Sequence, residues 1–184
     1  MKIKVGVSLR HVHLKEEDYK ELFEDSLSVK NYLNQPGQFS ANQTVTLEKN
    51  NKRIENVRII GPCRNYTQVE LSRTDAYYFK MNPPVKSSGD LSEAEEITII
   101  GPKASITRKA CIIADRHIHI TKEEREKYNL SKDIYEVRVN GEKGGIFSNV
   151  KIKEAPNSYF ELHLDSDDAN AFNIKQDDVV EIIE

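Results

Sequence analysis

The pentapeptide RHVHL at residues 10–14 returns as RHIHI at residues 116–120, so the chain carries an internal duplication. Four of its five histidines lie in these two copies. Alternating hydrophobic residues precede each copy and a short amphipathic stretch follows it, which predicts a strand, a histidine pair and a short helix in both places. The second helix is expected to begin after Thr121, because Thr121 and Glu124 form the T-x-x-E pattern of a capping box. A fold built from two related parts is therefore expected.

Short runs of β-branched residues fill most of the remaining chain. Turn signals such as Gly61-Pro62 and Asn140-Gly141 separate these runs. Short strands at nearly regular spacing, with few long helices, are typical of β-barrels or β-sandwiches. Residues 82–96, which are rich in Pro, Ser and Glu, are the only candidate for a linker. The duplication divides the chain into approximate halves, 1–90 and 91–184.

Composition indicates a soluble globular protein, because 38% of the residues are hydrophobic and 31% are charged. No apolar run of 18 residues occurs that could span a bilayer. A net charge of −3 with interspersed basic residues argues against binding to nucleic acid or membranes. The N-terminus enters a strand pattern without a signal peptide, so we expect a cytoplasmic protein. Cys63 and Cys111 form no C-x-x-C motif and are expected to be free thiols.

A second correspondence lies downstream of the two histidine pairs. The segment VELSRTDAYYFKM at residues 69–81 aligns without a gap with LHLDSDDANAFNI at residues 162–174, and this register places Glu70 on His163. Each half thus offers two imidazoles and one further side chain that can bind a metal ion. The first set is His11, His13 and Glu70, and the second set is His117, His119 and His163.

The H-x-H spacing has a chemical reason in a strand. Residues i and i+2 point to the same face about 6.6 Å apart, so both imidazoles can converge on one cation. Three nitrogen or carboxylate ligands with a fourth position open are typical of catalytic zinc, and two such sets predict a two-metal centre. Such ligands would also accept cobalt or manganese. The alternatives are that the duplicated histidines only pack, and that Glu70 is an ordinary solvated or salt-bridged residue.

Arginines near these sets are candidates for binding an anion. Arg64, in the turn segment GPCRNYTQVE, can offer a bidentate guanidinium to a phosphate. The alternative is an exposed turn arginine. Arg10 and Arg116 precede the histidine pairs and are expected to point to the opposite face as supporting residues. Arg73 is a weaker candidate. Cys63 would need activation by the neighbouring cation to act as a nucleophile, and no base stands beside it.

Eight sequence blocks, in this order, resemble the PduL-type phosphotransacylases, a family of zinc-dependent phosphate acyltransferases. They run from about residue 4 to the C-terminus: VGVSLRHVHL, QPGQFSANQTVTL, ENVRIIGPCRNYTQVELSRTDA, PPVKSSGDL, ITIIGP, ADRHIHI, GGIFSNVKIK and ELHLDSDDANA. The resemblance implies that acyl-CoA, with an acetyl or propanoyl group, reacts directly with phosphate to give acyl phosphate and coenzyme A. It also implies a mainly β fold of two barrels capped by short helices, in which the N-terminal strand joins the barrel of the C-terminal half.

The resemblance further implies that the six side chains named above bind two zinc ions and that Arg64 contacts phosphate. It implies one phosphotransacylase unit over residues 1–184, in which the histidine pairs share a site, and a homodimer. Family members that reside in bacterial microcompartments look as though they carry an extra amphipathic N-terminal encapsulation peptide. Only four residues precede Val5 here, so a freely cytoplasmic enzyme is expected. A dinuclear hydrolase of phosphate esters, esters or thioesters and a non-catalytic, metal-stabilised barrel are the alternatives.

Overall fold

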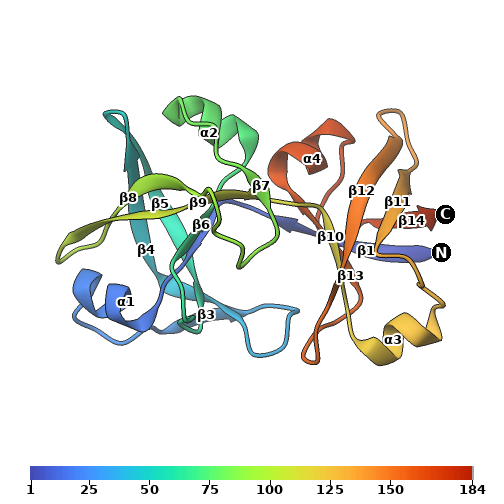
Figure 1. The fold of residues 1–184 in the computed structure, drawn as a ribbon, viewed down its shortest axis with the longest axis horizontal. Coiled ribbons are helices and arrows are strands. Elements are labelled where there is room, and N and C mark those ends of the chain that lie inside the picture. Colours follow the sequence, from blue (N-terminus) through green and yellow to red (C-terminus); the bar gives the residue numbers. More distant parts are fainter. Residues whose placement is uncertain (184) are drawn as a thin grey trace. The chain divides into compact units, whose positions relative to one another are not determined.

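A computed structural model describes residues 1–183, which form fourteen strands and four short helices (Figure 1). The chain divides into two compact units. The first unit holds residues 10–114, and the second unit holds residues 1–9 together with the residues from 115 onward. Within residues 1–183, every helix is too short or too polar to cross a membrane.

The first unit is a closed ring of six strands. Pairing runs in the order β4-β5-β2-β6-β9-β8 and returns from β8 to β4, while β3 and β7 attach to β4 and β9. Residues 82–96, the linker candidate, lie inside this unit. The elements are β2 (His11–His13), α1 (Glu16–Leu22), β3 (Val29–Tyr32), β4 (Phe39–Lys49), β5 (Lys52–Gly61), β6 (Gln68–Glu70), α2 (Arg73–Phe79), β7 (Val85–Lys86), β8 (Glu95–Ile100) and β9 (Ser105–Ala114).

The second unit is also a closed barrel of six strands, in the order β1-β13-β10-β12-β11-β14. Its elements are β1 (Lys2–Ser8), β10 (His117–Ile120), α3 (Lys122–Lys127), β11 (Ile134–Val139), β12 (Gly145–Glu154), β13 (Glu161–Asp165), α4 (Ser166–Ala171) and β14 (Val179–Ile183). The N-terminal strand therefore joins the C-terminal barrel, and the mainly β fold of two barrels with short helices is confirmed. The predicted capping box of Thr121 and Glu124 opens α3.

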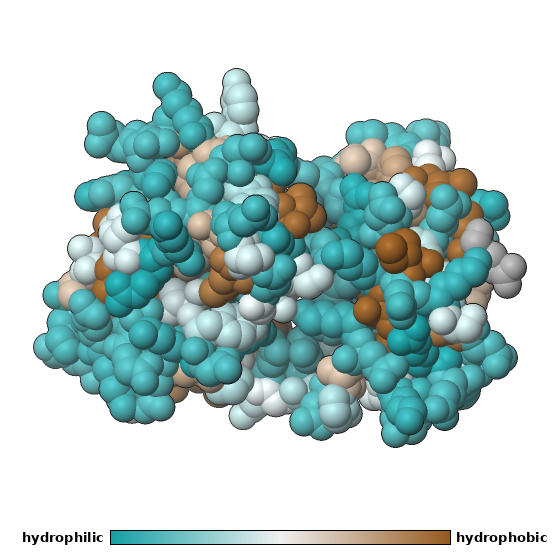
Figure 2. Space-filling view, in the orientation of Figure 1, coloured by the Kyte–Doolittle hydropathy of each residue, from teal (hydrophilic) through white to brown (hydrophobic). Residues whose placement is uncertain are grey.

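Strand alternation builds the core of each unit. In β11, Tyr135, Val137 and Val139 are buried and the residues between them are exposed, because successive side chains of a strand point to opposite faces. Large, fully buried side chains fill both interiors: Leu14, Leu22, Leu47, Ile59 and Phe79 in the first unit, and Ile118, Ile120, Leu162 and Leu164 in the second. The surface seen in Figure 2 is mainly hydrophilic, with scattered hydrophobic spots. Burial of apolar surface therefore stabilises each unit from within.

The two units repeat one strand arrangement around their histidine pairs. In the first unit, β2 is parallel to β5 and antiparallel to β6. In the second unit, β10 is parallel to β12 and antiparallel to β13. A further parallel strand follows in each case, β9 beside β6 and β1 beside β13. Strand β1 belongs to the second unit and leads into β2, which carries the histidine pair of the first unit. Strand β9 belongs to the first unit and leads into β10, which carries the histidine pair of the second unit.

In both units a short helix follows the strand that carries the third candidate ligand, β6 in the first unit and β13 in the second. Ser72 caps α2 by accepting the backbone N–H of Asp75 at 3.2 Å. Asp165 caps α4 by accepting the backbone N–H of Asp168 at 2.8 Å. Each cap satisfies a backbone donor that a helix N-terminus would otherwise leave unpaired. The gapless overlay of the two segments thus corresponds to the same strand, cap and helix.

Candidate metal sites

His11 and His13 lie on β2, beside the strand β6 that ends with Glu70. The pairing register places His11 directly opposite Glu70. The Nε2 atoms of the two imidazoles are 3.1 Å apart, and His11 Nε2 is 3.5 Å from a carboxylate oxygen of Glu70. The ligand atoms of all three side chains lie within 4.8 Å of one another. The folded chain thus brings together the first set of candidate ligands.

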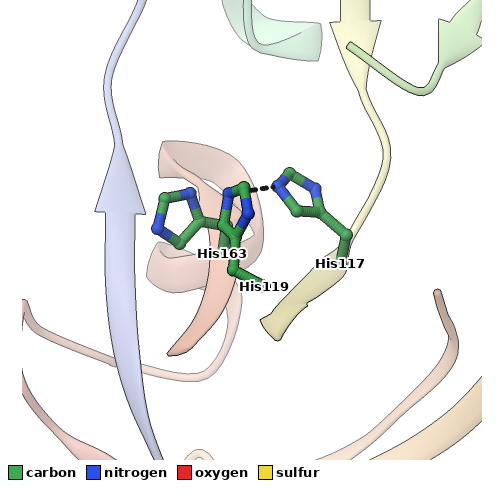
Figure 3. A group of neighbouring side chains, drawn as sticks. All are labelled: His117, His119 and His163. Atoms are coloured by element: carbon green, nitrogen blue, oxygen red, sulfur yellow. Dashed lines mark hydrogen bonds between the residues drawn. The ribbon is translucent and has the colours of Figure 1, made fainter. Parts of the chain in front are cut away.

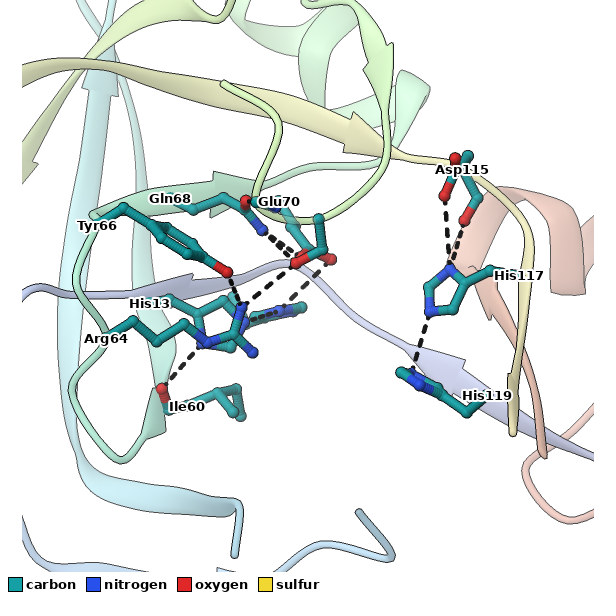
Figure 4. Close-up of polar contacts among 12 residues, drawn as sticks. His13, Ile60, Arg64, Tyr66, Gln68, Glu70, Asp115, His117 and His119 are labelled. Atoms are coloured by element: carbon teal, nitrogen blue, oxygen red, sulfur yellow. Dashed lines mark hydrogen bonds and ion pairs between the residues drawn. The ribbon is translucent and has the colours of Figure 1, made fainter. Parts of the chain in front are cut away.

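Burial favours a neutral imidazole at His13, and a hydrogen bond orients its ring. His13 Nδ1 lies 3.1 Å from the backbone carbonyl oxygen of Ile60, which leaves Nε2 for the side of His11 (Figure 4). The pKa of His13 lies well below its ordinary value, because burial disfavours the imidazolium and His11 adds repulsion. At neutral pH His13 is therefore uncharged, which is the form that binds metal ions.

The second unit repeats this geometry with an imidazole in place of the carboxylate. The register places His117 directly opposite His163, and the Nε2 atoms of His117 and His119 are 3.1 Å apart. Nδ1 of His117 lies 2.8 Å from the backbone carbonyl oxygen of Asp115. Figure 3 shows the three imidazoles gathered where β10 and β13 face each other. Burial, above all, lowers the pKa of His163, so this set also consists of ligands suited to a cation.

Both groups have the donor chemistry and spacing that a zinc-type ion needs. Zinc–nitrogen bonds of about 2.0 to 2.1 Å in tetrahedral geometry place neighbouring ligand atoms about 3.3 Å apart. The imidazole nitrogens of each pair are 3.1 Å apart. Each group offers three ligands, so a tetrahedral ion would keep one position for solvent or substrate. Cobalt and manganese accept the same ligands.

Arg64 is linked to the first group through polar side chains. Its Nη1 donates to the hydroxyl of Tyr66 at 2.8 Å and to Ser88 Oγ at 3.3 Å. Gln68 Nε2 donates to the same serine oxygen at 2.9 Å and to Glu70 Oε1 at 2.6 Å (Figure 4). Among residues 1–183, no hydrogen bond engages Nε or Nη2 of Arg64. These N–H groups therefore remain able to bind an oxyanion.

Sequence reasoning did not identify Tyr66, Gln68 and Ser88. Gln68 had a signal, because a residue two positions before Glu70 in a strand shares its face. Ser88 had none, since it lies 20 residues from Gln68 and only the folded chain brings them together. The backbone N–H of Gly89 donates to Gln68 Oε1 at 2.7 Å, which places the loop KSSGDL beside Arg64.

The other sequence candidates occupy supporting or peripheral positions. Arg10 and Arg116 each form an ion pair with an aspartate of the helix that follows Glu70 or His163. Arg73 is exposed and donates to Asn82 at 2.7 Å. The pKa of Cys63 is raised, mainly by burial, whereas an activated thiol needs a lowered pKa. These contacts give none of the four residues a direct part in either three-ligand group.

Fold and site together define a duplicated β-barrel protein that carries a three-ligand group in each barrel. The sequence model of the phosphate propanoyltransferase family matches residues 4–175. The chain therefore belongs to the phosphate propanoyltransferase family, and it is an acyltransferase.

Three relatives show the extent of this similarity, and each bears the name phosphate propanoyltransferase. The Thermotoga maritima protein is 45% identical over 98% of this chain and 88% of its own length. The Rhodopseudomonas palustris protein is 41% identical over 98% of this chain and 81% of its own length. The Salmonella typhimurium protein is 40% identical over 92% of this chain and 82% of its own length. The similarity therefore extends across both units.

Proposed function

We propose that the chain transfers an acetyl or propanoyl group reversibly between coenzyme A and phosphate. A phosphate oxygen forms the new bond to the thioester carbonyl carbon, and the bond from that carbon to sulfur breaks, so that acyl phosphate and coenzyme A result. The observation that carries this proposal is the position of Arg64, whose unengaged N–H groups stand next to the polar network of Glu70. The names of the relatives, which combine phosphate with a propanoyl group, support the same reaction.

The two three-ligand groups are proposed to hold two zinc ions. One ion would be held by His11, His13 and Glu70, and the other by His117, His119 and His163. Bound zinc would supply Lewis acidity toward the thioester carbonyl and the phosphate oxygens. The carbonyl oxygens of Ile60 and Asp115 accept the Nδ1–H of one histidine in each group and so keep its Nε2 free for ligation.

Arg64 is proposed to bind and orient the phosphate. Tyr66 and Ser88 hold its Nη1, which restrains the plane of the guanidinium. Nε–H and Nη2–H lie on one edge of that plane and match two oxygens of a phosphate. A phosphate held in this way pays less entropy when it attacks the thioester. Since phosphate is the nucleophile, no acyl-enzyme is needed, and the raised pKa of Cys63 agrees with this route.

Release of free thiol from acetyl-CoA and propanoyl-CoA, with and without phosphate, tests the proposal. We expect release that requires phosphate, is lost on chelation and returns with zinc. Arg64→Ala should lower kcat/KM for phosphate by about a hundredfold or more, as the loss of a preorganised donor does in other enzymes. Arg73→Ala is the matched control, because it removes an exposed arginine of the same unit and should leave the rate unchanged.

Each other outcome would contradict a specific part of the proposal. Thiol release without phosphate would indicate a metal-dependent hydrolase. A metal-loaded protein that releases no thiol from either substrate would be a metal-stabilised barrel without this activity. If Arg64→Ala retained the wild-type rate, the phosphate role of Arg64 would be wrong. The ratio of kcat/KM for the two thioesters would identify the preferred acyl group.

A further inference from the structure

The third imidazole of the second unit is held by two neighbours on its own strand segment. His163 Nε2 lies 2.6 Å from the hydroxyl oxygen of Tyr159 and 3.0 Å from Glu161 Oε2. The Tyr159 hydroxyl also donates to Glu161 Oε2 at 2.9 Å. Among residues 1–183, no hydrogen bond engages Nδ1 of His163. Two polar oxygens therefore contact Nε2, while Nδ1 is left for another partner.

This triangle of atoms decides which ring nitrogen carries the proton. An ionised carboxylate can only accept hydrogen bonds, so a contact of 3.0 Å with Glu161 requires a proton on His163 Nε2. The N–H can then serve both Glu161 and the tyrosine oxygen, and the tyrosine proton serves the carboxylate. The opposite tautomer would set a lone pair of Nε2 against the lone pairs of Glu161. The neutral ring with its proton on Nε2 carries its lone pair on Nδ1.

In the first unit, the residue at the equivalent position supports a different type of candidate ligand. Gln68 stands two residues before Glu70, as Glu161 stands two residues before His163, and in each case the two side chains share a strand face. Gln68 donates its amide N–H to Glu70 Oε1 at 2.6 Å. A carboxylate ligand is thus paired with a donor and an imidazole ligand with an acceptor. The repeat preserves the supporting position and changes its chemistry to suit the ligand.

Gly6 leaves the space that this contact occupies. It is the residue of β1 that pairs with His163. A Cβ at Gly6 would lie 2.5 Å from Glu161 Oε2 and 2.9 Å from His163 Nε2, closer than such atoms approach in proteins. The Glu161 carboxylate has little room to move aside, since this residue is 4% exposed. Any side chain at this position would separate the carboxylate from the imidazole.

We propose that Glu161 and Tyr159 are positioning residues that keep the proton of His163 on Nε2 and thereby present Nδ1 as the metal ligand. His117, by contrast, has its Nδ1 at a carbonyl oxygen and presents Nε2. The inference rests on the proposed metal sites and adds the atom through which one ligand binds. Partners of this kind fix the tautomer of a ligating histidine and strengthen its binding.

Long-range proton–nitrogen correlation NMR of the zinc-loaded, ¹⁵N-labelled protein reads the tautomer directly. We expect His163 to carry its proton on Nε2 and His117 to carry its proton on Nδ1. A protonated Nδ1 on His163 would overturn the inference. Signals of His163 are assigned by their absence from the spectrum of His163→Gln.

Zinc competition with a chromophoric chelator measures what the two neighbours contribute. Glu161→Gln can donate an amide N–H to an unprotonated Nε2, so it should move the proton of His163 to Nδ1. The affinity for one of the two zinc ions should then fall by about ten- to a hundredfold. Tyr159→Phe keeps the ring, which stacks on His119, and should lower the affinity for the same ion by a smaller factor. Gly6→Ala should also lower the affinity for this ion. In all three variants the other ion should keep its wild-type affinity.

Tyr128→Phe is the matched control, because Tyr128 packs on Phe160 in the same unit and its removed hydroxyl has no hydrogen bond within residues 1–183. It should bind both ions as the wild type does. Unchanged affinity for both ions in Glu161→Gln would overturn the positioning role alone. A wild-type protein that binds no zinc would overturn the proposed metal sites and this inference together.

Discussion

Arg116 and Asp168 form an ion pair with two hydrogen bonds: Nε donates to Oδ2 at 2.8 Å and Nη2 donates to Oδ1 at 2.7 Å. Arg116 directly precedes His117, and Asp168 lies in the first turn of α4, just after the strand that carries His163. The pair therefore ties the beginning of β10 to the end of β13. Arg10 and Asp75 make the equivalent contact in the first unit, with Nη1 and Oδ1 2.7 Å apart.

The Arg116–Asp168 pair should contribute about 1 kcal/mol of coupling free energy to folding. Two charge-assisted hydrogen bonds favour a larger value, but the Arg116 side chain is 35% exposed and solvent screens the charges. Chemical denaturation of Arg116→Ala, Asp168→Ala and the double variant measures this coupling. Arg138 and Glu181, an exposed pair 3.6 Å apart, provide the control cycle, with coupling near zero. Equal coupling in both cycles would contradict the special role of the first pair.

Asp18 makes the stability of the first unit depend on pH. This buried carboxylate accepts hydrogen bonds from Arg108 at 2.7 Å and from Thr67 at 2.6 Å. Burial by itself would raise the pKa of Asp18, but the hydrogen bonds from Arg108 and Thr67 outweigh it and lower the pKa below its ordinary value of 3.8. A carboxyl with a lowered pKa stabilises the folded protein while it is ionised. The contribution is complete above that ordinary pKa and is lost as the pH falls through the lower pKa of the folded state.

Asp18→Asn should therefore lower the free energy of unfolding at pH 7 by about 2 kcal/mol, because it leaves Arg108 without its buried partner. The difference from the wild type should shrink as the pH falls below 3.8. Urea denaturation between pH 7 and pH 3 measures both effects. Glu123→Gln, on exposed α3, is the control for loss of one negative charge. A difference that stays constant over this pH range would show that the ionisation of Asp18 is not its cause.

Metal analysis of His11→Ala and His117→Ala tests the assignment of one ion to each group. Each variant should retain one of the two ions, because the other three-ligand group is intact. Chelation of the wild type should lower its melting temperature, since an ion that binds only the folded state stabilises that state. Both variants should lose thiol release. A variant that keeps two ions at wild-type affinity would remove its histidine from the ligands.

Cys63→Ser should retain the wild-type rate of phosphate-dependent thiol release. Burial raises the pKa of Cys63, so little of the nucleophilic thiolate exists at pH 7. Burial also raises the pKa of Cys111 to about 12, so Cys111 should resist alkylation in the folded protein. Iodoacetamide labelling followed by mass spectrometry measures the second effect. A loss of activity of more than about tenfold in Cys63→Ser would make covalent catalysis the better account.

The sequence alone predicted the local units of this protein. Period-two alternation identified the strands, and the T-x-x-E pattern identified the start of α3, because both depend on neighbours a few residues away. The overlay of Glu70 on His163 also came from the sequence, since duplicated segments keep equivalent positions in register. Two barrels followed from the family resemblance, and the structure confirmed them.

Tertiary structure decided which distant residues meet. The exchange of β1 into the C-terminal barrel, the approach of Ser88 to Arg64 and the space that Gly6 leaves for Glu161 depend on strand pairing across the chain. Alternation tells which face a side chain takes but not which strand lies beside it, and pairing depends on burial of the whole core. The candidate ligands could therefore be found in the sequence, whereas most of the contacts that hold them in place appeared only in the folded chain.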